Sequence, residues 1–173
     1  AGTNLTIRSI KVDGSDDVTD WKLLNTITVE VKVRNDGDDR VKDVIVELGL
    51  FDDSGLNQIG DVEFISSDSE TIDLGSLSDG DSDTAIFEFK VPADFETGSY
   101  RLAIKAFSDT NEDEDCVDAI DEELFQSVTV DNEDDDQRTI VVDEIRLPTE
   151  AVCGETVSGE FIAANIGSDD EDQ

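Results

Sequence analysis

The chain has 173 residues and carries 46 acidic against 12 basic side chains, which gives a formal net charge of -34 at pH 7. Nucleic acids and anionic membrane surfaces are bound through clustered Lys and Arg, and the cations here are scattered along the sequence, so neither is an expected partner. No apolar run approaches the ~20 residues that cross a bilayer, so we expect no direct membrane insertion by this stretch.

Apolar residues recur at every second position in a series of short runs, a pattern typical of half-buried β-strands. In chain order the predicted strands are 5–12, 27–33, 44–50, 86–91, 100–106 and 125–130. A three-residue step predicts a bulge near Ile10 in the first strand. In the fourth strand we expect Ile86 on the inner face, with Phe87 and Phe89 alternating outward.

Clusters of Asp, Ser and Gly separate these strands, and no segment of useful length has a helical period. Six or seven short strands without intervening helices predict an all-β fold, an antiparallel β-sandwich. Tyr100, which opens a late strand after Gly98, is placed as the tyrosine of a tyrosine corner, or else it is an ordinary core residue. Trp21 lies in the first long loop, where it either straps one end of the sandwich or offers a ring for stacking on a carbohydrate.

An internal repeat divides the chain. Residues 26–37 align without gaps on residues 156–167, and both segments end in Asn-x-Gly. Upstream, three apolar positions of the first strand match three before the second copy, namely Ile7, Ile10 and Val12 with Val142, Ile145 and Leu147.

This repeat predicts the domain organisation. We expect a β-sandwich domain over residues 1–130, an acidic, charge-extended linker over 131–137, and the first two strands of a second, incomplete domain over 138–173. Two strands of a sandwich cannot bury one face unaided. The alternatives that would cover them are strands from a neighbouring chain, a remainder of the second domain, or docking against the first domain.

Five short segments carry a resemblance to a known family. They are Asn35-Asp36-Gly37, Val44-x-Val46-x-Leu48, Leu74-Gly75-Ser76-Leu77, Phe87-x-Phe89-x-Val91-Pro92 and Gly98-Ser99-Tyr100-x-Leu102. Together they resemble the CARDB-type adhesion-related immunoglobulin-like domains, which recur as tandem arrays in archaeal and bacterial surface proteins. The resemblance spans about residues 5 to 130, and the insert from about Phe51 to Thr71 departs from the compact pattern of the family.

With the acidity, this resemblance implies a structural component of an archaeal cell surface, an S-layer or surface array, extracellular and adapted to salt. Its partners would be other copies of itself or other surface proteins. Two alternatives stay open, an adhesin-type module that binds glycans or another cell, and a filament subunit assembled by strand donation. The family carries no catalytic residues, and its motifs specify the fold rather than the function.

Chemistry is expected mainly at the acidic loops. The sequence contains no His and no nucleophile triad of the usual kinds, so we do not expect an enzyme. Asp-rich loops supply the oxygen ligands that calcium prefers, which makes calcium the one expected cofactor, unless these loops are simply a solvated acidic surface. The candidate ligands are Asp109, Asn111, Asp113 and Asp115 in one loop and Asp79, Asp81 and Asp83 in another.

Two further features concern covalent modification. Asn4-Leu5-Thr6 is an N-glycosylation sequon, which has meaning only if the chain is exported. Cys116 and Cys153 are the two cysteines, and a bridge between them would clamp the two domains across the acidic linker. Closing that loop would stabilise the fold by roughly 4 kcal/mol on the entropic model. Free thiols, or a partner cysteine elsewhere, are the alternative.

Overall fold

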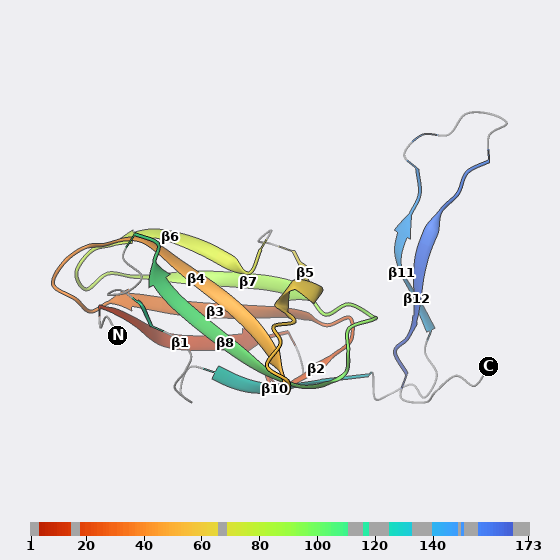
Figure 1. The fold of residues 1–173 in the computed structure, drawn as a ribbon, viewed down its shortest axis with the longest axis horizontal. Helices are drawn as coiled ribbons and strands as arrows, with labels where there is room; N and C mark the ends of the chain where they lie inside the picture. Colours follow the sequence, from red (N-terminus) through yellow and green to blue (C-terminus); the bar gives the residue numbers. More distant parts are fainter. Residues whose placement is uncertain are drawn as a thin grey trace.

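The structure is a computed structural model that describes residues 4–14, 18–65, 69–110, 116–117, 125–132, 140–148, 150 and 156–167. Its main body is a pair of β-sheets packed face to face, and a separate two-stranded sheet follows in the chain (Figure 1). The one helical element within these residues is a 3₁₀ turn, η1 (Ile59–Asp61), and none of their helices is long and apolar enough to cross a membrane.

Each sheet is assembled from strands that are distant in the sequence. The first sheet has the order β1 (Leu5–Asp13), β3 (Thr26–Asn35), β7 (Ser82–Lys90) and β5 (Glu63–Phe64). The second has the order β2 (Asp20–Lys22), β10 (Phe125–Asp131), β8 (Gly98–Ser108), β4 (Val41–Asp52) and β6 (Thr71–Leu77), with β9 (Cys116–Val117) paired to β8. The separate sheet pairs β11 (Ile140–Arg146) with β12 (Glu160–Asn165).

The core lies between the two large sheets and follows from alternation along each strand. On β3 the side chains of Ile27, Val29, Val31 and Val33 are fully buried, and the residues between them point the other way. One cluster of buried apolar residues unites both sheets. The predicted all-β class and the immunoglobulin-like sandwich are therefore confirmed.

The orientation predicted for the fourth strand is wrong. Phe87 and Phe89 of β7 are fully buried, whereas Ile86 is half exposed. β7 pairs with β3 so that these rings lie opposite Val29 and Ile27, and directly opposite residues share one face of a sheet. The register therefore turns both phenylalanines into the core.

The short strand β2 carries Trp21 and departs from the predicted antiparallel pattern, because it pairs with β10 in parallel. Trp21 is fully buried, and its ring meets Phe89 edge to face with centroids 5.7 Å apart. The next residues tie the loop to the sandwich, since the Leu23 N–H donates to the Asp131 carbonyl at 3.1 Å. Trp21 is thus a strap, and its burial rules out stacking on a carbohydrate.

Tyr100 forms the predicted tyrosine corner. Its hydroxyl donates a hydrogen bond of 2.6 Å to the main-chain carbonyl of Glu96, four residues upstream. Burial, and then the nearby Glu96 carboxylate, raise the pKa of the Tyr100 hydroxyl, so it remains a neutral donor at physiological pH.

Removal of this hydroxyl tests the corner. We expect Tyr100→Phe to lower the free energy of unfolding by about 1 kcal/mol, because one partly buried hydrogen bond is lost while the ring still packs. Urea unfolding followed by circular dichroism measures the change. An unchanged midpoint would show that the Glu96 carbonyl is satisfied equally well by water.

The β11–β12 pair repeats the geometry of β1–β3. Leu5 pairs with Asn35 and Ile7 with Val33 in the first case, and Ile140 with Asn165 and Val142 with Ala163 in the second. Both pairs then contain an irregularity, between Ile7 and Ser9 and between Asp143 and Arg146. The bulge predicted near Ile10 thus lies slightly earlier in β1, and the sequence repeat corresponds to a repeat in register.

Candidate functional site

The first predicted calcium loop is the turn between β6 and β7. Asp79, Asp81 and Asp83 are all exposed there, and the Asp83 carboxylate accepts a hydrogen bond of 2.8 Å from the Thr84 N–H. The turn is held by its backbone, since the Asn35 N–H donates to the Asp81 carbonyl at 3.0 Å. In the part of the chain that the structure describes, no three His, Cys, Asp or Glu side chains come together to hold a metal ion. The turn therefore does not gather its three carboxylates.

The second predicted calcium loop follows β8. Asp109 is exposed, and its N–H donates to the Asp43 carbonyl at 2.9 Å, which docks the start of the loop on β4. Asn111, Asp113 and Asp115 lie outside the described residues. A calcium site in this loop stays a prediction.

The cysteine pair and the linker also stay predictions. Cys116 lies in β9, where it pairs with Phe107 of β8, but its side chain lies outside the described residues, as does the whole of Cys153. Of the predicted linker over 131–137, the structure describes only its first two residues, and Asp131 is the last residue of β10.

The sequon at Asn4 packs on the turn that ends β3. Asn4 is half-buried, and its Oδ1 lies only 2.6 Å from where a Cβ on Gly37 would stand. Thr6 is also engaged, because its hydroxyl donates a hydrogen bond of 2.6 Å to Asp36 Oδ2. The folded chain thus holds both polar residues of the sequon against one turn, and attachment of a glycan stays a prediction.

The structure brings together cations that the sequence separates. An open hollow of about 490 Å³ on the outer face of the first sheet is lined by Arg8, Ser9, Lys32, Arg34, Gly80 and Ser82. Strand pairing produces this cluster, because Ser9 lies opposite Lys32 and Ser82 opposite Arg34. Alternation along β3 places Lys32 and Arg34 on one face, but only the register brings Arg8, Ser9 and Ser82 beside them.

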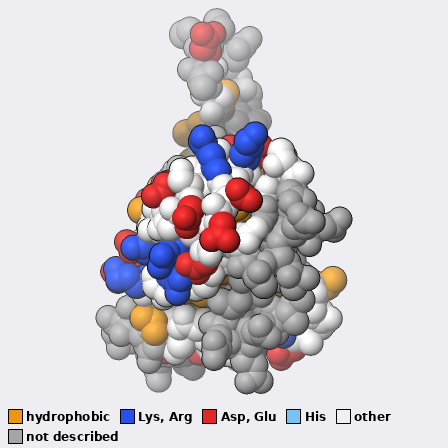
Figure 2. All heavy atoms as spheres, turned by 90° about the vertical axis from the view of Figure 1, so that its left-hand side faces the viewer, with side chains coloured by type: hydrophobic (Ala, Val, Ile, Leu, Met, Phe, Trp, Pro, Cys, Tyr) orange, Lys and Arg blue, Asp and Glu red, His pale blue; other side chains and the backbone are white. Residues whose placement is uncertain are grey.

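Asp36 binds two of these cations at once. Its Oδ1 lies 2.6 Å from Arg8 Nη2 and 3.2 Å from Arg34 Nε. Hydrogen bonds from Thr6 and then Arg8 hold the pKa of the Asp36 carboxyl below its ordinary value. Figure 2 looks onto the left-hand end of the sandwich of Figure 1 and shows, among the described residues there, Lys and Arg side chains beside carboxylates.

The loop after β4 is organised by a single carboxylate, Asp52. Its Oδ1 accepts hydrogen bonds from the Ser54 hydroxyl and N–H at 2.7 and 2.9 Å and from the Leu56 N–H at 2.9 Å. Its Oδ2 accepts one from Gln58 Nε2 at 3.0 Å. The bonds from Ser54 and Gln58 are the largest causes that lower the pKa of Asp52 to about 2. Sequence analysis missed this loop, although Asp followed two residues later by Ser is a known turn signal.

This pKa predicts a pH dependence. A carboxyl whose pKa is lowered on folding contributes stability above its ordinary pKa of 3.8, and this contribution is lost as the pH falls towards 2. We therefore expect Asp52→Asn to be less stable than the parent at pH 7, and the difference to shrink between pH 4 and pH 2. Thermal melts of both proteins across this range measure it. A difference that is constant with pH would contradict the assignment.

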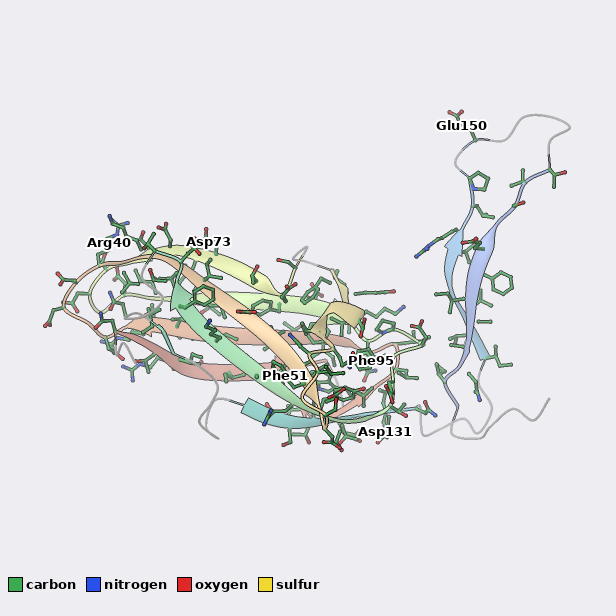
Figure 3. All side chains as sticks on the ribbon, in the orientation of Figure 1. Arg40, Phe51, Asp73, Phe95, Asp131 and Glu150 are labelled. Carbon is green, nitrogen blue, oxygen red and sulfur yellow. The ribbon has the colours of Figure 1, made fainter. Side chains whose placement is uncertain are left out.

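A second hollow, of about 330 Å³, lies at the end of the sandwich that carries the Asp52 loop, opposite to the end seen in Figure 2. It is lined by Gln58, Asp61, Asp94, Phe95, Glu96 and Tyr100. Figure 3 places Phe95 at the end of the sandwich nearest to β11–β12, and Arg40 and Asp73 at the opposite end.

Comparisons with known proteins find likeness of fold only. No family model matches the sequence, and no curated protein matches it. Among solved structures, a CARDB domain from Pyrococcus furiosus, solved in complex with di-metal ions, is 16% identical with a TM-score of 0.44, over 75% of this chain and 90% of that one. The C-terminal domain of wzt is 16% identical with a TM-score of 0.48, over 77% and 76% of the two chains.

Part of an enzyme is also among these structures. A family 123 glycoside hydrolase from Clostridium perfringens is 12% identical with a TM-score of 0.45, and the match covers 74% of this chain but only 27% of the hydrolase. A domain of the family that the sequence motifs resemble is among these structures. The class that the fold of this chain defines is an immunoglobulin-like β-sandwich.

Proposed function

We propose that this chain is a structural component of a cell surface, an S-layer or surface array of an archaeon, built of acidic immunoglobulin-like modules in tandem. The observation that supports it best is the recurrence of one strand-pair geometry, first as β1–β3 and again as β11–β12. Repetition of one module extends a protein along a line, which suits a scaffold. The proposal assigns no catalytic role to any residue.

The charge supports the same role. With a net charge of -34, copies repel each other at low salt, and screening by salt allows them to approach. The partners proposed are therefore other copies or other surface proteins in a salty medium. The burial of Trp21 leaves the alternative of a glycan-binding adhesin without its one proposed aromatic platform.

Electron microscopy of the purified chain in multimolar salt, with and without calcium, tests this role. We expect two-dimensional sheets or filaments, and the same sample dialysed to low salt is the control, which should disperse. A monodisperse monomer in salt and calcium, shown by sedimentation, would count against an assembling surface protein.

Calcium is proposed to stabilise the loop that contains Asp109 and Asp113. We expect calcium to raise the melting temperature of the parent more than magnesium at the same ionic strength, because the loop offers alternate oxygen ligands. Asp113→Ala should abolish this difference, and Asp53→Ala, an exposed residue of another loop, should not. Equal melting temperatures in calcium and magnesium would contradict a specific site.

A further inference from the structure

The β11–β12 pair presents an apolar face that nothing covers within the described residues. Figure 1 shows the two strands standing beside the end of the sandwich, and Figure 3 shows side chains projecting from them. Six of the large apolar side chains exposed on this pair and its flanks share one face, and Ile162, 37% exposed, lies on the other face of β12: the six are Ile140, Val142, Ile145, Leu147, Val157 and Phe161. Phe161, for example, is 63% exposed. A two-stranded sheet that exposes such a face is marginal in water.

The first copy of the repeat shows what such a face requires. Val31 of β3 is the equivalent of Phe161, and it is fully buried. It and its neighbours are covered by the sheet that contains β4 and β8, and their own strand is paired along its second edge by β7. β12 has only β11 as a partner among the described strands.

The equivalence extends to individual pairs of residues. Lys11 lies opposite Glu30 in the first copy, and Arg146 lies opposite Glu160 at the same place in the second. Because one residue of slip would turn every side chain to the other face, a conserved register means that the same face is apolar in both copies. The exposed face of β11–β12 is therefore the equivalent of the buried face of β1–β3.

The turn after the second strand is also repeated. The Gly37 N–H donates to Asn35 Oδ1 at 2.9 Å, and the Gly167 N–H donates to Asn165 Oδ1 at 3.0 Å. In the first copy the chain leaves this turn and enters β4, in the opposite sheet, at Val41. The second turn therefore has the same hydrogen bond as the turn from which the first copy crosses to its opposing layer.

We propose that the apolar face of β11–β12 is half of the core of a second sandwich, and that its occupant is a β-sheet supplied in cis, by the polypeptide that follows Gly167. This sheet would carry equivalents of β4 and β8 over the face, and an equivalent of β7 on the free edge of β12. The main difference between the apolar face of β11–β12 and that of β1–β3 lies on the second strand of each pair. Phe161, flanked by Gly159 and Ala163, replaces the row Val29, Val31 and Val33, so the occupant must accommodate a large ring between small residues.

The turn that follows β12 is already held against the first sandwich. Ile166, within the repeated turn, is buried, and Asn132 Nδ2 donates to the Gly167 carbonyl at 3.1 Å. This contact fixes the turn beside the end of β10 while it leaves the apolar face open. The inference rests on the tandem part of the proposed function and not on the location at a cell surface.

A longer chain, made from this protein's own sequence, tests whether a second sheet can cover the apolar face of β11–β12. Residues 38–131, which complete the first sandwich, are appended directly after Gly167, and amide hydrogen exchange of β11 and β12 is compared with that in the 173-residue chain. We expect exchange at least about tenfold slower in the extended chain, with a second cooperative unfolding transition, because burial and pairing protect amides. Phe161→Asp in the extended chain is the control and should remove the protection.

The appended strands come from the first sandwich, so their side chains could fail to fit around Phe161. A second extended chain serves as the control for this mismatch in volume, and it carries Leu147→Val, Gly159→Val, Phe161→Val and Ala163→Val. These substitutions reproduce Val12, Val29, Val31 and Val33 of the first copy. Absence of protection in both extended chains would overturn the proposal. So would a 173-residue chain that is already protected at β12 and dimeric by sedimentation equilibrium, because a second copy would then be the occupant. Neither result depends on array formation, so failure here is distinguishable from failure of the surface role.

Discussion

Replacing Trp21 with alanine is expected to lower the free energy of unfolding of the sandwich by about 3–5 kcal/mol, which is the usual cost of truncating a buried aromatic residue. The ring is fully buried and packs edge to face on Phe89. Its strand, β2, has only three residues and is anchored beside β10. Loss of the ring therefore leaves a cavity and also weakens the strap that holds this end together.

Urea unfolding followed by circular dichroism measures this loss, with Leu56→Ala as the matched control. Leu56 is 63% exposed, so its truncation should change the stability by no more than about 0.5 kcal/mol. A loss below about 1 kcal/mol for Trp21→Ala would show that β2 is dispensable. The fluorescence of the parent adds an independent readout, because a buried indole should resist quenching by acrylamide.

Most of the long strands can be predicted from the sequence, because burial of one face of a strand produces an uninterrupted alternation of apolar and polar residues. β3 and β4 carry four apolar residues each at alternate positions, and both were placed correctly. β2, β5 and β9 have only two or three residues, too few for a period to show, and they were missed. The seven-residue strand β6 was missed as well, because Gly75 and Ser76 interrupt its apolar alternation. In β7, Ala85, Phe87 and Phe89 form the apolar phase, whereas Ile86 alternates with Glu88 and Lys90. The alternation thus already favours burial of both phenylalanines, as the pairing with β3 shows, and the expected orientation gave too much weight to Ile86.

The polar features also fall into those that the sequence predicts and those that only the fold brings together. Tyr100 could be placed from the sequence because its partner carbonyl is four residues away. The cluster of Arg8, Lys32 and Arg34 could not, because Arg8 meets the two cations of β3 only through the register of β1 and β3. Carboxylates are so common in this chain that their spacing cannot identify a metal site, and among the described residues the turn at Asp79 does not form one.

Asn35 is the polar residue whose replacement should cost most. It is fully buried, its amide donates to the carbonyls of Asp39 and Leu77 at 2.8 and 3.0 Å, and its Oδ1 accepts from the Gly37 N–H. Asn35→Asp would point a carboxylate at two carbonyl oxygens. We expect a loss of about 3–5 kcal/mol at pH 7, the cost of an uncompensated buried charge.

The sign of the pH dependence follows from the same geometry. Burial and the facing carbonyls favour the neutral form of the new carboxyl, so its pKa in the folded state is raised above its ordinary value of about 3.9. The folded variant therefore binds a proton that the unfolded chain has lost, and its deficit relative to the parent should be smallest below pH 4 and grow as the pH rises. Urea unfolding at pH 4 and pH 7 measures this change.

The repeat supplies the matched control for this substitution. Asn165→Asp alters the equivalent residue of β12, which accepts the same hydrogen bond from Gly167 but lies outside the sandwich. It should leave the unfolding of the sandwich unchanged within about 0.5 kcal/mol at both pH values. Equal losses for the two variants would mean that the β11–β12 pair and the sandwich unfold as one unit, because only then would a carboxylate at residue 165 destabilise β3.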